Sequence, residues 1–132
     1  MIGLDTNVLA RLFVDDDIEQ ARLARQFVLQ RCSPENPAFV DRVALCEMVW
    51  VLTSVHGYRR NQVAAVLDTL VAIPEIIMED MDAVRTAIPV FRGRGIDFAD
   101  ILMGRVNRAR GCDATATFDR KAAKLDGFTL LG

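Results

Sequence analysis

The residues best suited to chemistry in this chain are acidic, and they are spread along its length. Asp5 follows a short apolar run at the N-terminus, Glu47 interrupts a strongly apolar segment, and Asp119 follows a predicted strand. Asp100 stands three residues after Asp97 in the stretch GIDFADIL. Two charged carboxylates about 4 Å apart repel by about 4 kcal/mol at an effective dielectric constant near 20. Acids that gather at one place therefore require a cation.

The cation that such a group selects is a hard divalent ion. The candidate donors are all oxygens, and the cysteines, Cys32, Cys46 and Cys112, match neither a zinc pattern nor a disulfide framework. Oxygen donors favour Mg²⁺ or Mn²⁺ over zinc, and these ions commonly take up substrate phosphates. A bound ion also lowers the pKa of water and neutralises charge on a phosphate. The residues therefore predict metal-assisted hydrolysis of a phosphodiester.

The two aspartates of GIDFADIL are expected to have different roles. A carboxylate near a helix N-terminus is worth roughly 0.3–1 kcal/mol, so capping alone explains both. Asp97 fits the N-cap, and we predict that it is mainly a cap or an outer residue of the site. Asp100 then occupies the third helical position and is predicted to bind metal. Gly104, one turn later, is expected to let the first strand pass close to Asp100.

Strands and helices alternate in the predicted secondary structure. Apolar runs predict strands at 1–4, 38–40, 76–78, 114–118 and 128–131. Helical spacing, caps and breakers predict helices at about 8–13, 17–31, 41–55, 60–72, 81–91, 97–110 and 119–125. In the third of these, one stripe is expected to carry Val43, Cys46, Val49, Trp50 and Thr53. The alternation predicts an α/β fold, with a parallel sheet covered by helices.

A parallel sheet explains how distant acids come together. Ligand sites in such sheets lie outside the carboxyl ends of the strands. Asp5 and Asp119 each follow a strand, and the helix that carries Asp100 leads to the second of these strands, so the three are expected to converge. Glu47 must reach solvent or meet a cation, because burying an unpaired charge costs several kcal/mol.

Length and charge limit the remaining possibilities. The 132 residues predict a single domain, residues 1–132. No apolar run is long enough for a membrane span and no targeting segment is evident, so a cytoplasmic location is expected. Residues 1–83 carry 7 basic and 13 acidic side chains, whereas residues 84–132 carry 9 basic and 5 acidic ones. A basic second half permits binding to phosphate backbones.

Taken together, LDTNVL at the N-terminus, Glu47, DFADIL and TFDR resemble a PIN domain, in particular the VapC-type toxin ribonucleases of toxin–antitoxin pairs. The resemblance covers nearly the whole chain. It implies a three-layer α/β/α sandwich with a central, mostly parallel sheet. It also implies an endoribonuclease that requires Mg²⁺ or Mn²⁺, forms a homodimer and is inhibited by a small antitoxin protein.

The same resemblance assigns roles to individual residues. Its acidic quartet, which would hold the metal, is Asp5, Glu47, Asp100 and Asp119. Asp5 and Asp100 are expected to be the main ligands, Glu47 either a ligand or the group that activates the water, and Asp119 a ligand directly or through water. Asn7 and Thr117 are implied to be polar neighbours that order water, ligands or substrate, and Arg120, with the arginines of residues 92–110, is expected to grip RNA. The implied reaction is attack of water on an RNA phosphate in line with the leaving 3′-oxygen. It leaves 5′-phosphate and 3′-hydroxyl ends.

Other functions remain open from the sequence. A haloacid-dehalogenase-like phosphatase also uses an aspartate after its first strand, but it needs a second acid where Asn7 stands. A receiver-type phosphoacceptor domain needs paired acids and a late lysine, and neither is evident. Within the PIN resemblance, the alternatives are a housekeeping RNA-processing nuclease and a catalytically silent binding module.

Overall fold

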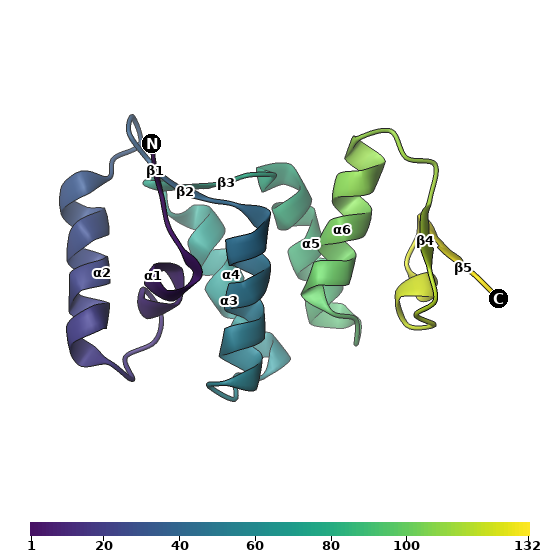
Figure 1. Cartoon of the computed structure of the whole chain (residues 1–132), viewed down its shortest axis with the longest axis horizontal. Coiled ribbons are helices and arrows are strands. Elements are labelled where there is room, and N and C mark those ends of the chain that lie inside the picture. Colours follow the sequence, from purple (N-terminus) through teal and green to yellow (C-terminus); the bar gives the residue numbers. More distant parts are fainter. The chain divides into compact units, whose positions relative to one another are not determined.

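The computed structural model describes all 132 residues and divides the chain into two compact parts, which are described separately (Figure 1). We call Met1–Met81 the N-terminal part and Asp82–Gly132 the C-terminal part. None of the helices is long and apolar enough to cross a membrane.

The N-terminal part is built on a parallel sheet of three short strands in the order β1-β2-β3. These strands are β1 (Ile2–Gly3), β2 (Ala38–Val40) and β3 (Ile76–Met78). In the register, Ala38 lies opposite both Ile2 and Ile76. Its helices are α1 (Thr6–Arg11), α2 (Ile18–Arg31), α3 (Arg42–Ser54) and α4 (Arg60–Ala72). Helix α1 packs against both α2 and α3, while α4 packs against α3 and β3.

Side-chain caps explain where these helices begin. Asp17 accepts a hydrogen bond from the Gln20 backbone amide at 3.0 Å, and Asp41 accepts one from the Ala44 amide at 2.8 Å. Each bond satisfies an amide that the first turn of a helix leaves without a partner. The predicted helices at 17–31, 41–55 and 60–72 are therefore confirmed to within one residue at their ends.

The apolar stripe predicted for α3 is only partly right. Val49 is buried, but Val43 and Trp50 are exposed by 66% and 63%. The buried face carries instead four other apolar residues: Ala44, Leu45, Met48 and Leu52. Almost every residue of this segment is apolar, so periodicity does not identify the buried face.

The C-terminal part contains two helices and a pair of parallel strands. The helices are α5 (Met81–Gly93), whose first residue closes the N-terminal part, and α6 (Phe98–Ala109). The strands are β4 (Thr115–Thr117) and β5 (Phe128–Leu130), joined by the 3-10 turn η1 (Ala122–Lys124). A helix was predicted at 119–125, and only this shorter turn forms.

Aromatic packing joins the two helices of the C-terminal part. The rings of Phe91 on α5 and Phe98 on α6 meet edge to face, with centroids 5.7 Å apart and planes at 88°. This is a favoured arrangement for two aromatic rings. Phe98 is also among the largest fully buried side chains of the chain, so the first turn of α6 is firmly anchored. The predicted α/β class, with parallel strands flanked by helices, is confirmed.

Candidate active site

Asp5 lies between β1 and α1 and acts as the N-cap of that helix. Its Oδ1 accepts a hydrogen bond from the Val8 backbone amide at 2.9 Å, and its side chain is exposed. The helix begins at Thr6, two residues earlier than predicted, because this cap closes the polar turn. The bond fixes one carboxylate oxygen of Asp5. Its Oδ2 has no hydrogen-bond partner and so is free to bind a ligand.

Glu47 is held next to the same turn by a side-chain hydrogen bond. Thr6 Oγ1 donates to Glu47 Oε2 at 2.9 Å, which joins residues 41 positions apart. Glu47 lies on α3 and is exposed, so its charge reaches solvent, one of the two outcomes expected. As with Asp5, one oxygen is held and the other, Oε1, has no hydrogen-bond partner. The N-terminal part thus brings Asp5, Thr6 and Glu47 to one place.

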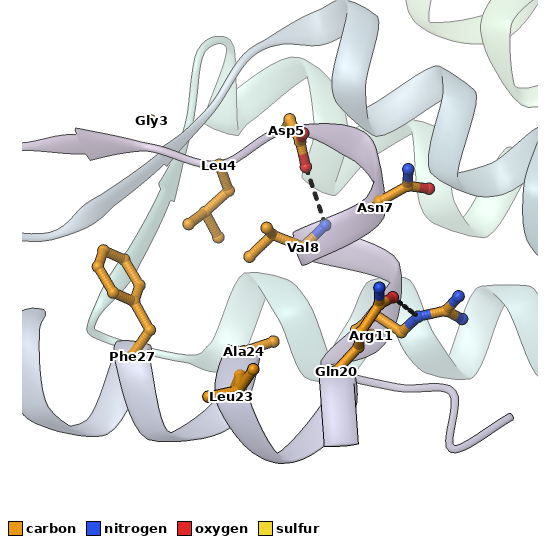
Figure 2. A pocket seen from close by; sticks show the side chains of 10 residues that line it. All are labelled: Gly3, Leu4, Asp5, Asn7, Val8, Arg11, Gln20, Leu23, Ala24 and Phe27. Atoms are coloured by element: carbon orange, nitrogen blue, oxygen red, sulfur yellow. Dashed lines mark hydrogen bonds between the residues drawn. The ribbon is translucent and has the colours of Figure 1, made fainter. Parts of the chain in front are cut away.

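A cavity of about 430 Å³ opens beside Asp5 (Figure 2). Its walls are mostly apolar, with Leu4 and Val8 near β1 and α1 and Phe27 on α2. Asp5 and Asn7 supply polar groups to its lining. The predicted neighbour Asn7 is therefore on the first turn of α1, exposed and next to this cavity. Asp5 therefore borders a concave surface that can hold an apolar group.

Asp100 lies in the first turn of α6 and is partly buried. Burial raises the pKa of Asp100 above its usual value, and the negative charges of Asp97 and Asp119 raise it further. Both effects disfavour the ionised carboxylate. None of the three acids forms an ion pair with an arginine or lysine. In the C-terminal part, Asp100 is therefore under the influence of two other carboxylates, and none of the three is paired with a basic side chain.

Asp119 is fixed by the backbone that follows it. Its Oδ1 accepts hydrogen bonds from the amides of Lys121 and Ala122, at 2.8 and 3.3 Å. Its own amide donates to Thr117 Oγ1 at 2.9 Å, so the predicted neighbour Thr117 orients the turn that carries Asp119. Asp119 Oδ2 has no hydrogen-bond partner. The same pattern recurs in Asp5, with one oxygen held and the other unbound.

The prediction that Asp97 is mainly a cap or an outer residue of the site is confirmed only for its position. Asp97 occupies the N-cap position of α6, but its side chain makes no capping hydrogen bond. Its charge helps to raise the pKa of Asp100, after the larger effect of burial. Within the C-terminal part, a Cβ on Gly104 would overlap the ring of Phe128, so the glycine makes room for a side chain of β5. The predicted approach of the first strand to Asp100 stays a prediction, because that strand belongs to the N-terminal part.

The donors fit a hard divalent cation. They are carboxylate oxygens, which Mg²⁺ and Mn²⁺ prefer, and three acids hold one oxygen in place while leaving the other unbound. The crowding of Asp100 would be relieved by positive charge. Within neither part do three or more such residues come close enough to hold an ion by themselves. That Asp5, Asp100 and Asp119 converge stays a prediction, because the first belongs to a different part from the others.

Thr6 is a site residue to which the sequence analysis gave no role. Its hydroxyl positions Glu47, a function that the sequence signals only through its place between Asp5 and Asn7. Arg120, predicted to contact substrate, is exposed directly after Asp119. Its position next to an acid is compatible with a contact to RNA, and that role stays a prediction.

Residues 2–128 match the PIN domain family, so the match spans both parts of the chain. No curated protein matches the sequence. PIN domains are typically metal-dependent nucleases. The crowded, all-oxygen carboxylates described above are donors of the kind such nucleases need. On the extent of this match, the chain belongs to the PIN domain family.

Proposed function

We propose that this protein is a Mg²⁺- or Mn²⁺-dependent endoribonuclease whose catalytic acids are Asp5, Glu47, Asp100 and Asp119. The observation that carries the proposal is the state of Asp100. In a chain that belongs to a family of metal-dependent nucleases, this aspartate is partly buried beside two further carboxylates, with no cation to balance them. Acids whose pKa is shifted by burial together with specific neighbouring charges are candidates for functional sites.

Each acid has a role that follows from its held and unbound oxygens. Asp5 and Asp100 are proposed as the principal metal ligands, and Asp119 supports them through its unbound Oδ2. Glu47, fixed by Thr6 at Oε2, accepts a proton from the attacking water at Oε1. The bound metal ion supplies charge neutralisation at the phosphate and a lowered pKa for water. Asp97 acts on Asp100 through its charge alone.

The proposed reaction is hydrolysis of an RNA phosphodiester. Water adds to phosphorus, the bond to the 3′-oxygen breaks, and the proton lost by water is balanced by the proton that the leaving oxygen gains. The products carry 5′-phosphate and 3′-hydroxyl ends. Analysis of the ends of the cleaved RNA tests this directly, because 2′,3′-cyclic phosphate ends would indicate attack by the ribose hydroxyl instead.

The activity test uses purified protein that has been unfolded, freed of bound partners and refolded. End-labelled transfer, ribosomal and messenger RNAs are incubated with Mg²⁺, with Mn²⁺ and with EDTA. We expect cleavage with either metal and none with EDTA or in Asp5→Asn. Asp113→Asn, an exposed acid in a loop, is the matched control and should cleave as wild type. Wild-type protein that leaves every RNA intact would overturn the proposal.

We also propose that the nuclease is the toxin of a toxin–antitoxin pair, that it forms a homodimer, and that its two parts make one domain. The resemblance to VapC-type toxins and the family match across both parts support this.

The toxin role is tested by expressing the protein in bacteria. Expression of wild type should stop their growth, whereas expression of Asp100→Asn should not. Co-expression of a short neighbouring open reading frame should restore growth. Intact cleavage without growth arrest would favour a housekeeping RNA-processing nuclease. A wild-type protein that neither cleaves RNA nor stops growth would favour a catalytically silent binding module.

A further inference from the structure

A second cavity, of about 240 Å³, lies within the C-terminal part and is strongly basic. It is formed by the end of α5, one face of α6 and residues 124–128. Four cationic side chains line it: Arg94, Arg105, Arg108 and Lys124. The one acid in its lining is Asp126. The cavity therefore carries an excess of positive charge in a concave space.

These four cations have no carboxylate partners. None of them forms an ion pair, although other arginines of the chain, such as Arg22 and Arg42, do. Two of them are linked by a hydrogen bond from Arg94 Nη2 to the backbone carbonyl of Lys124, at 3.2 Å. Like charges that converge without counter-ions repel. An anion is the ligand that would relieve this repulsion.

The shape of the cavity depends on two glycines. Gly104 on α6 lacks the Cβ that would overlap the Phe128 ring, so the ring lies against the helix and forms one wall. Gly127 has φ +88°, and a Cβ there would lie 2.8 Å from Arg108 Nη2. The Arg108 guanidinium is thus held close to the backbone of the loop. The two glycines therefore shape one wall of the cavity and let the Arg108 guanidinium approach the loop.

We propose that this basic cavity binds an internal phosphate of the RNA substrate. The inference rests on the proposed ribonuclease function and names the residues that grip its substrate. Guanidinium groups match phosphate geometry with two parallel hydrogen bonds. Arg105 and Arg108 follow Asp100 on the same helix, and at 1.5 Å rise per residue they lie roughly 7 and 12 Å further along its axis. We assign the bound phosphate to a position in the RNA other than the phosphate that is cleaved.

The proposal also separates the arginines that the sequence analysis grouped together. Arg94, Arg105 and Arg108 line the cavity, whereas Arg92 and Arg110 do not. Arg110 stands just beyond Arg108 at the end of α6 and is exposed. It supplies a control with the same charge and nearly the same position.

The experiment measures binding of single-stranded RNA to the full chain in EDTA, so that cleavage is absent. The double variant R105Q/R108Q is compared with R22Q/R110Q, which removes the same charge outside the cavity. We expect the dissociation constant of R105Q/R108Q to rise roughly tenfold, as for loss of hydrogen bonds to a charged group. Its dependence on salt should also weaken by about 0.7 in the slope of log K against log salt for one lost phosphate contact. R22Q/R110Q should match wild type in slope.

Further variants keep the test sharp. R105K/R108K retains the charge but not the planar fork, so it should keep the salt slope while losing part of the affinity. Thermal melting must show that each variant is as folded as wild type. If R105Q/R108Q melts at a lower temperature than wild type, the affinity of R105K/R108K for RNA is compared with that of wild type instead. RNA with a 5′-phosphate and RNA with a 5′-hydroxyl should bind equally, because the site takes an internal phosphate.

Two results would overturn the inference: equal weakening by R105Q/R108Q and R22Q/R110Q, or tighter binding of 5′-phosphorylated RNA that R105Q/R108Q abolishes. The first would assign the effect to net charge and the second to a terminal phosphate. Failure of the proposed function looks different, since wild type would bind RNA in EDTA but cleave none with Mg²⁺ or Mn²⁺. The two failures are therefore separable.

Discussion

The two parts of this chain hold their acids by different means. In the N-terminal part, Asp5 and Glu47 are exposed and each is fixed by a hydrogen bond. In the C-terminal part, Asp100 is partly buried and its pKa is raised by burial and by two neighbouring acids. The cavities of the two parts also differ: the one in the N-terminal part is mostly apolar, and the one in the C-terminal part is basic. One part positions its carboxylates and the other crowds them, so substitutions should affect the two in different ways.

The largest expected effect is loss of cleavage when a proposed metal ligand is neutralised. Asp5→Asn and Asp100→Asn should each lower the rate by more than the roughly 10–100-fold that loss of an outer partner costs. Single-turnover cleavage of a labelled RNA with saturating Mn²⁺ measures this, with Asp113→Asn as the control. If only one of the two variants loses activity, the chemistry belongs to one part alone.

The next effect tests how the N-terminal part positions Glu47. Thr6→Val removes the hydroxyl that holds Glu47 Oε2 while keeping the size of the side chain. Cleavage should fall by roughly 10–100-fold, as for other partners that orient catalytic groups. Thr6→Ser restores the hydroxyl and should restore most of the rate. Full activity in Thr6→Val, with loss confined to Thr6→Ser, would show that Thr6 matters through its methyl group and not through this hydrogen bond.

A smaller effect compares one cap from each part. Asp17→Ala removes a hydrogen bond to the Gln20 amide and should lower the free energy of unfolding by about 1 kcal/mol. Asp97→Ala removes no such bond and removes a negative charge that repels Asp100. The free energy of unfolding of this variant should therefore stay within about 0.5 kcal/mol of the wild-type value. Urea denaturation of metal-free protein measures both. A loss at Asp97 as large as that at Asp17 would restore its capping role.

The smallest effect concerns the pH dependence of stability. Because the pKa of Asp100 is raised in the folded state, ionising it disfavours folding as pH rises through that value. Metal-free Asp100→Asn should therefore melt slightly higher than wild type at pH 7. At pH values well below the ordinary aspartate pKa of about 3.9, Asp100 is protonated in both states, and the contribution should vanish. Melting curves across this range test it, and a wild type that is more stable at pH 7 would contradict it.

Local sequence signals predicted most of the elements. The caps Asp17 and Asp41, with Pro74 and Gly111 as breakers, set the bounds of α2, α3, α4 and α6 closely. The same signals placed Asp100 in the first turn of α6. These features depend on residues within a few positions of one another, which is the range over which sequence patterns act.

What the sequence could not supply depends on distant contacts or on side-chain geometry. The bond between Thr6 and Glu47 spans 41 positions, and no local pattern predicts it. Asp97 has the right residue type and position for a cap, yet its side chain accepts no hydrogen bond from the first turn of α6. The basic second half was evident in the composition, but its division into lining and outer arginines required the packing of α6 against residues 124–128.

Gly104 has a consequence for attempts to engineer this protein. A glycine inside a helix is an obvious target for stabilisation, since alanine there is worth about 1 kcal/mol in helix propensity. Here the added methyl group would displace the Phe128 ring, and with it a wall of the basic cavity. A design rule that improves the isolated helix would therefore be expected to weaken the protein's hold on its substrate.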